Sequence, residues 1–292
     1  MISSLQELVA PLTAAEFIGL LHARAITYRP SLNRNRFLEL VDSHGLHELI
    51  VSGTFPPKEL RVHVKTEPVL PAFYLRQGKV DPAALALLIK KGVSLIMNPL
   101  DPYVSSLATI CRQMKSELRE KVFAGAIVTT GSGGAFKLHY DAQDVIVLQV
   151  EGAKRWKIYP APVVNPVGGM PEQAPPHDKP IFDETLLPGD LLLVPGGYWH
   201  HCENVPELSL HVVFQLVPPT GWHAVKALTS KLLTEETFRV PFTRLANAEE
   251  VAAHEMELKQ RLIETIGRLS FSDFLSRDAD EAPSVIGADD GA

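Results

Sequence analysis

Between residues 123 and 216 the chain alternates short β-prone runs with turns rich in glycine and proline, and this pattern limits the possible folds. The spacing between the runs favours strands joined by turns over the helical crossovers of a parallel sheet. We therefore expect a sandwich or barrel, mainly β with flanking helices. The expected strands cover residues 126–130, 145–150, 155–159, 190–194 and 208–216.

Helices and short strands are expected on the N-terminal side of this core. Thr13 and Glu16 have the spacing of a capping box, which predicts that a helix begins there. Asp101 and Pro102 have the residue types of an N-cap and a first helical position, so a helix is expected from there to about Glu120. Short strands are expected over 61–64 and 93–97.

Two proline-rich segments divide the rest of the chain. The eight prolines between Pro160 and Pro188 predict a long loop without regular structure. Pro218-Pro219 predicts a boundary, beyond which helices are expected over 222–233 and 247–269. The expected regions are an N-terminal helical and short-strand region (1–100), a β-rich core (101–218), a C-terminal helical region (219–277) and a disordered acidic tail (278–292).

The second C-terminal helix has an apolar face that needs a partner. Asn247 and Glu250 have the spacing of a cap and its third residue. The apolar residues that follow at helical spacing are Val251, Leu258, Leu262, Ile266 and Leu269. Such a face packs either on the barrel or on another subunit, so a homodimer through the C-terminal helices is one expectation.

Charge and cysteine content exclude several classes of protein. The formal net charge is −6, but residues 278–292 hold five acidic residues and no basic one, so the remainder is nearly neutral. We expect no bulk binding of nucleic acid, which needs clustered lysine and arginine. Two cysteines give no disulfide framework, and no apolar run reaches the ~20 residues of a membrane span. The expectation is a cytoplasmic protein that does not enter a membrane.

Three residues have the chemistry of a metal site. His139 and Asp141 are two residues apart, and in a strand they would lie on one face. His200 follows the Pro195-Gly196-Gly197 turn, where a neighbouring strand would begin. Two histidines and one carboxylate on one side of Fe(II) leave open coordination positions, as in non-haem oxygenases. The same residues also allow a simpler interpretation, a surface pair at 139 and 141 and a polar loop at 200.

A lysine near the expected metal site suggests an anionic co-substrate. We expect a hairpin turn at Glu151-Gly152 to fold Lys154 back beside the strand that follows the metal-binding residues. There its ammonium would pair with a dicarboxylate, because a buried carboxylate needs a charge-assisted contact.

Taken together, these residues resemble the JmjC-type, cupin-like Fe(II)/2-oxoglutarate oxygenases. The resemblance covers roughly residues 10–220 and is strongest to the ribosomal-oxygenase and asparaginyl-hydroxylase branches. It rests on His139-x-Asp141, on Lys154 fifteen residues after the first ligand, and on the pattern Gly189-Asp190…Pro195…Trp199-His200. It implies a double-stranded β-helix (jelly roll) with His139, Asp141 and His200 as metal ligands and catalytic centre. The implied cofactors are Fe(II), 2-oxoglutarate as co-substrate and O2.

One position departs from the family pattern. The family often has an asparagine that helps to hold 2-oxoglutarate at a position that falls on about Gly125, so the contact is missing or comes from Thr129, Thr130 or Ser132. Our candidates for 2-oxoglutarate binding are therefore Lys154, Thr129 and Ser132. Candidates for the substrate pocket are Trp199, His201 and His211.

The resemblance implies hydroxylation of a protein or peptide side chain, with release of succinate and CO2. N-demethylation is the same chemistry at an N-methyl carbon and stays open. Two alternatives also remain: a hydroxylase of a small natural product or biosynthetic peptide, and a metal-binding cupin without catalytic activity.

Overall fold

The computed structural model describes residues 2–132, 134–171, 173–205, 207–268 and 270. The expected acidic tail over 278–292 and Leu269 lie outside these residues. The chain divides into two compact units, of which the first covers residues 1–217 and the second begins at Pro218.

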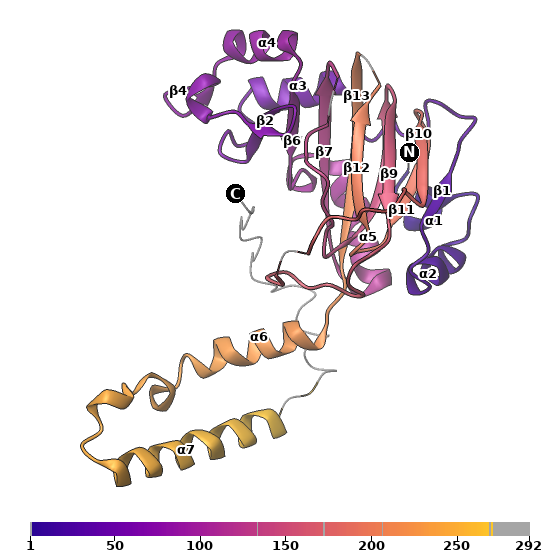
Figure 1. The fold of residues 1–292 in the computed structure, drawn as a ribbon. Helices are drawn as coiled ribbons and strands as arrows, with labels where there is room; N and C mark the ends of the chain where they lie inside the picture. Colours follow the sequence, from indigo (N-terminus) through magenta and orange to yellow (C-terminus); the bar gives the residue numbers. More distant parts are fainter. Residues whose placement is uncertain (1, 133, 172, 206, 269, 271–292) are drawn as a thin grey trace. The chain divides into compact units, whose positions relative to one another are not determined.

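The first unit is built on two antiparallel sheets (Figure 1). The larger sheet has the order β1-β11-β8-β13-β7-β6-β2-β3, and the smaller has the order β10-β9-β12. The larger sheet contains β1 (Thr27–Arg29), β2 (Leu60–Val64), β3 (Glu67–Pro68), β6 (Ser94–Met97), β7 (Lys121–Thr130), β8 (Asp144–Glu151), β11 (Leu191–Val194) and β13 (Leu208–Val217). The smaller sheet contains β9 (Lys154–Tyr159), β10 (Phe182–Leu186) and β12 (Trp199–Asn204). A separate short ribbon pairs β4 (Leu75–Arg76) with β5 (Lys79–Val80).

The two faces of the larger sheet pack against different partners. Because side chains alternate along a strand, β8 directs Val145 and Val147 toward the smaller sheet, and Ile146 and Leu148 toward the helices. The helices are α1 (Leu5–Val9), α2 (Ala14–His22), α3 (Ser43–Val51), α4 (Pro82–Lys91) and α5 (Ser105–Leu118), with short 3-10 turns at Pro71–Phe73 (η1) and Asp101–Tyr103 (η2). The expected mainly β fold with flanking helices is confirmed.

Two of the sequence expectations for local structure are wrong. Asp101 does not cap a helix: α5 begins at Ser105, and the Asp101 carboxylate instead accepts a hydrogen bond from the Ala124 backbone at 2.9 Å. The proline-rich segment is not all loop, because Phe182–Leu186 forms β10, which pairs along the whole of its length with β9. The expectation rested on the proline content of the whole segment and so overlooked the five proline-free residues of this strand. The capping box of Thr13 and Glu16 is present as expected.

The expected hairpin before Lys154 is also wrong. β8 and β9 are not paired, and the chain crosses from the larger sheet to the smaller one between them. Gly152 makes this change of direction with φ of +60°, in the left-handed region that favours glycine. The crossing places Lys154 at the start of β9 and inside the space between the sheets, where it is fully buried.

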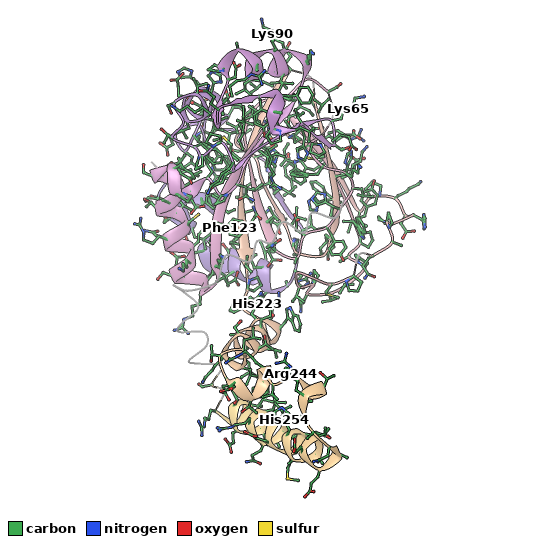
Figure 2. The ribbon with its side chains drawn as sticks, turned by 90° about the vertical axis from the view of Figure 1, so that its left-hand side faces the viewer. Lys65, Lys90, Phe123, His223, Arg244 and His254 are labelled. Carbon is green, nitrogen blue, oxygen red and sulfur yellow. The ribbon has the colours of Figure 1, made fainter. Side chains whose placement is uncertain are left out.

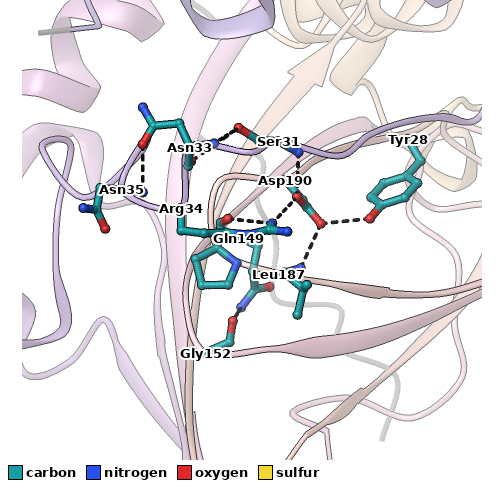
Figure 3. Close-up of polar contacts among 10 residues, drawn as sticks. Tyr28, Ser31, Asn33, Arg34, Asn35, Gln149, Gly152, Leu187 and Asp190 are labelled. Carbon is teal, nitrogen blue, oxygen red and sulfur yellow. Dashed lines mark hydrogen bonds and ion pairs between the residues drawn. The ribbon is translucent and has the colours of Figure 1, made fainter.

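Asp190 joins the N-terminal segment to the core (Figure 3). Its buried carboxylate accepts hydrogen bonds from the Tyr28 hydroxyl (2.8 Å) and from the backbone N–H groups of Ser31 and Leu187 (both 2.9 Å). It also pairs with the Arg34 guanidinium at 2.9 Å. The preceding Gly189 has φ of +88°, which turns the chain so that Asp190 faces these donors. The Gly-Asp pair of the sequence pattern therefore has a structural role.

The second unit is helical. It contains α6 (Gly221–Leu232), α7 (Ala248–Gly267) and two 3-10 turns, Glu236–Arg239 (η3) and Phe242–Arg244 (η4). Asn247 caps α7 by accepting a hydrogen bond from the Glu250 N–H at 2.9 Å, as expected. Across the described part of the chain, none of the helices combines the length and the apolar character that a membrane crossing requires.

The Asp190 network predicts a large effect of a small substitution. Asp190→Asn keeps the size of the side chain but removes the charge that four donors share, so we expect the free energy of unfolding to fall by about 3 kcal/mol. Denaturant unfolding followed by circular dichroism measures this. Asp183→Asn is the control, because Asp183 pairs with Arg155 near the surface and should leave the denaturation midpoint almost unchanged. Equal effects of the two substitutions would contradict the central role of Asp190.

Candidate metal and co-substrate site

His139, Asp141 and His200 converge at one end of the space between the sheets. One ligand atom from each residue lies within 4.8 Å of the other two, a separation that a single metal ion can bridge. The Asp141 carboxylate lies 3.9 Å from His139 Nε2 and 3.6 Å from His200 Nε2. His139 is not in a regular strand: a single antiparallel bridge to His200, the second residue of β12, sets its position. The three residues expected from the sequence are therefore brought together.

Hydrogen bonds to the backbone fix both imidazole rings in the form that binds metal. His139 Nδ1 lies 2.8 Å from the Lys137 carbonyl oxygen, and His200 Nδ1 lies 3.1 Å from the Tyr198 carbonyl oxygen. A carbonyl oxygen only accepts, so each Nδ1 carries the hydrogen and each Nε2 has a free lone pair. This second contact of a ligating histidine is typical of metal sites in proteins. The residues present therefore fit a divalent metal.

Burial keeps the His200 ring neutral. Desolvation, helped by the neighbouring His139, lowers the pKa of His200 to about 4. A metal binds only the neutral imidazole, so the ring does not have to lose a proton near pH 7 before it binds. His139 is more accessible, with about 36% of its side chain exposed, and lies on the open side of the site.

Lys154 is buried inside the protein, and among the described residues no carboxylate pairs with it. Its side chain is fully buried, and its ammonium donates to the Thr129 hydroxyl at 3.0 Å and to His211 Nδ1 at 3.3 Å. Neither acceptor carries a negative charge. Burial lowers the pKa of Lys154, and burial together with the Lys154 charge lowers the pKa of His211. A buried ammonium of this kind is stabilised when an anion enters beside it.

Trp156 connects the two halves of the site. Its ring stacks on His200 with a centroid distance of 5.8 Å, and it meets the edge of His211 at 5.7 Å. Its indole N–H is buried and has no hydrogen-bond partner. Trp156 was not among the site residues expected from the sequence. The sequence did contain a signal for this position: Trp156 and Lys154 are two residues apart on β9, so their side chains lie on the same face of the strand.

The other predicted site residues lie in different surroundings. Thr129 contacts Lys154 and His211 lies in the barrel interior, as described above. Trp199 and His201 alternate with His200 along β12 and so point to the other face, where Trp199 packs against Tyr140 and His201 lies 3.4 Å from Glu203. Ser132 is exposed in the loop after β7. The structure therefore does not bring Ser132, Trp199 or His201 into the space beside the metal ligands.

Asn98 occupies the space that Gly125 leaves on β7. A Cβ atom at residue 125 would lie 3.1 Å from Cβ, Cγ and Oδ1 of Asn98, and this Oδ1 is buried without a partner. Thr130 is not a substitute, because its hydroxyl bonds the backbone at Ile89 and Val93 on the helical side of the sheet. The amide missing from residue 125 is thus matched by one from the segment after β6. In the sequence, the only sign of this arrangement was the glycine at residue 125. The pairing of β6 with β7 is needed to identify Asn98 as its neighbour.

Comparisons with known proteins agree with this geometry. Residues 100–227 match the model of the JmjC domain. This part of the chain is similar to a JmjC domain. The bifunctional lysine-specific demethylase and histidyl-hydroxylase NO66 of Drosophila grimshawi is 36% identical over 128 residues, which are 41% of this chain and 17% of that protein. NO66 of Drosophila persimilis is 29% identical over 220 residues, which are 66% of this chain and 31% of that protein.

The chain spans less than a third of the length of these curated relatives. Among solved structures, the Escherichia coli ribosomal oxygenase YcfD superposes with a TM-score of 0.59 at 18% identity, covering 91% of this chain and 72% of that one. A structure of YcfD in complex with cobalt and succinic acid gives a TM-score of 0.55 at 17% identity, with coverage of 91% and 71%. These likenesses confirm the JmjC-type, cupin-like fold that the sequence predicts.

The site predicts selective loss of metal binding. His200→Ala and Asp141→Asn each remove one ligand, so we expect affinity for Co(II) to fall by more than the roughly 10–100-fold cost of losing a supporting contact. Titration followed by the visible absorption of bound cobalt measures this. His201→Ala is the matched control, because it removes the adjacent histidine on the other face of β12 and should leave affinity unchanged. Loss of binding in the His201 variant alone would contradict the assignment.

Proposed function

We propose that this chain is an Fe(II)- and 2-oxoglutarate-dependent oxygenase that hydroxylates a side chain of a protein or peptide. The observation that carries the proposal is the buried ammonium of Lys154 in the same interior as a site of two histidines and one carboxylate. The ligand set is the one that non-haem Fe(II) oxygenases use, with positions left open for other ligands. A buried cation in the same interior as the metal-ligand set suits a dicarboxylate co-substrate, because Lys154 would pair with one of its carboxylates.

The residues of the chain divide the work of this reaction. His139, Asp141 and His200 would hold the metal, which when bound would supply the activation of dioxygen. In the overall reaction one oxygen atom enters succinate and the other enters the product alcohol, with release of CO2. Lys154 pairs with the distant carboxylate of 2-oxoglutarate, while the Thr129 hydroxyl and neutral His211 hold the ammonium in place. The Trp156 indole lines the space from the metal ligand His200 to His211, the neighbour of the ammonium.

The interior on the Lys154 side of this site is largely apolar. Between the two sheets lies a cluster of buried apolar side chains from five strands. It comprises Val145, Val147, Trp156, Ile158, Leu186, Leu192, Val194 and Cys202. In such a dry interior the attraction between the Lys154 ammonium and a carboxylate is stronger than in water, which orients the co-substrate.

The substrate class is supported by the names of the relatives. NO66 is named a histidyl-hydroxylase and a lysine-specific demethylase, and YcfD is titled a ribosomal oxygenase. Both names point to protein substrates, so we favour a protein side chain over a small natural product. Lys154 argues against a metal-binding cupin without activity, because metal binding alone does not require a buried cation. A product that gains one oxygen atom marks hydroxylation, and release of formaldehyde marks demethylation.

Turnover of 2-oxoglutarate tests the proposal. Purified protein with Fe(II), ascorbate, 2-oxoglutarate and cell extract as the source of substrate is expected to form succinate. Lys154→Ala removes a charge-assisted contact worth about 1.5–3 kcal/mol, so we expect kcat/KM for 2-oxoglutarate to fall by at least about tenfold while Co(II) binding persists.

The matched control is Lys157→Ala on the same strand. Lys157 points to the other face of β9, where it pairs with Glu203 at 3.1 Å, so its loss should leave turnover unchanged. Absence of succinate formation by the unmodified protein in extract would refute the oxygenase proposal. Equal effects of the two lysine substitutions would refute the role of Lys154.

We also propose that the C-terminal helices form a homodimer. Among the described residues of α7 none is buried. The apolar side chains of Val251, Ile263 and Ile266 are 38%, 67% and 56% exposed. Leu258 and Leu262 lie one helical turn apart on the face that includes Val251 and Ile266. An amphipathic helix of this length with an open apolar face is stabilised by covering it, and a second copy of the same helix supplies a matching face.

Light scattering on the full chain tests the dimer. We expect a mass of two chains for the unmodified protein and of one chain for the Leu258→Lys, Leu262→Lys double variant, because two charges on the apolar face cannot be buried together. Gln260→Lys, on the opposite side of α7, is the control and should leave the dimer intact. A monomer in the unmodified protein would refute the interface.

A cytoplasmic location is part of the same proposal. Cys111 and Cys202 are both buried free thiols. Free thiols are the usual state of cysteine in a reducing compartment.

A further inference from the structure

A cavity of about 400 Å³ lies on the helical side of the larger sheet, in the first unit. Its walls come from α3 and α4, and its floor comes from β6, β7 and the start of β13. Val128 and Thr130 line this cavity, whereas Thr129 between them points to the opposite face and contacts Lys154. The sheet therefore separates the cavity from the candidate metal site, and the two are distinct.

The interior of the cavity is apolar. Its surface is formed largely by aliphatic side chains, of which Leu46 and Ile50 of α3 and Leu95 and Val128 of the sheet are themselves buried. Ala86 and Ile89 of α4 close the other side. A volume of this size is within the range of small-molecule sites, about 300–1,000 Å³. An apolar group that covers this surface removes it from water, which favours an apolar occupant.

Three of the polar residues around the cavity are basic. His44 and His47 of α3 and Lys90 at the end of α4 line it, and no acidic side chain is among its described lining residues. Figure 2 shows Lys90 at the outer edge of the first unit, reaching toward solvent. Ser43 adds no free donor, because its N–H and hydroxyl both donate to the Glu151 carboxylate, at 2.6 and 2.8 Å. The remaining donors suit one anionic group near Lys90.

We propose that this cavity binds an amphiphilic carboxylate, with its alkyl chain between α3 and α4 and its carboxylate beside Lys90. The aliphatic walls remove the chain from water, which is the main favourable contribution. The Lys90 ammonium and the two imidazoles supply charge-assisted hydrogen bonds to the head group. The proposal concerns a second site and does not depend on the oxygenase activity.

Three probes with the same tail test the head group. Decanoate, 1-decanol and decyltrimethylammonium are titrated into the full chain by calorimetry at concentrations below micelle formation. We expect saturable binding of one decanoate per chain, at least about tenfold tighter than binding of either other probe, because only decanoate gains the contact with Lys90. Absence of saturable decanoate binding, or equal affinity for decanol, would overturn the proposal.

Paired substitutions on α4 test the location. Lys90→Glu should weaken decanoate binding at least about tenfold, whereas Lys91→Glu, which changes the neighbouring lysine outside the cavity, should not. Ala86→Trp should block the alkyl chain and abolish binding, whereas Leu87→Trp on the exposed side should preserve it. Ala86, Leu87, Lys90 and Lys91 are all exposed, so each variant is expected to fold, which circular dichroism checks. Equal effects within either pair would place the ligand elsewhere and overturn the proposal.

Discussion

The cation of Lys154, buried between the two sheets, is the constraint around which the candidate site is organised. A protein interior does not accept a lone ammonium without compensation, and here the Thr129 hydroxyl and the His211 ring supply only neutral acceptors. The three strands that carry these residues, β9, β7 and β13, come from both sheets. The interior is therefore built to receive an anion, and the apolar cluster around it keeps that anion away from water.

The metal ligands depend on a different kind of support. Each histidine is held by a backbone carbonyl two residues earlier, so the local chain fixes the ring before any metal is present. The bridge between His139 and His200 then joins two segments that are 61 residues apart, through hydrogen bonds of 3.2 and 2.7 Å. Orientation comes from short-range contacts and convergence comes from long-range pairing. The candidate ligands could therefore be identified from the sequence, but the pairing of His139 with His200 that brings them together could not.

Errors in the sequence interpretation share one physical cause. Asp101-Pro102 has the residue types of a helix start, but the Asp101 carboxylate finds the Ala124 N–H on β7 instead. The hairpin expected at Gly152 is replaced by a crossing between sheets, although the turn itself is present. Ser132 was one of the candidates for the contact missing at Gly125, and it lies in the exposed loop after β7. These expectations came from local sequence patterns, whereas the contacts that form depend on strands distant in the sequence.

By itself, the sequence predicted the β-rich core and the capped helices at Thr13 and Asn247. It also identified His139, Asp141, Lys154 and His200 as candidate site residues. These follow from periodicity, from capping chemistry and from the resemblance to a known family, all of which are local or pattern-based. Only the tertiary structure decided that Trp156 lies between His200 and His211, that Asn98 fills the space at Gly125, and that a cavity remains between α3 and α4. The physical reason is that these contacts depend on strand register and sheet packing, which join residues far apart in the chain and are not encoded by any one segment.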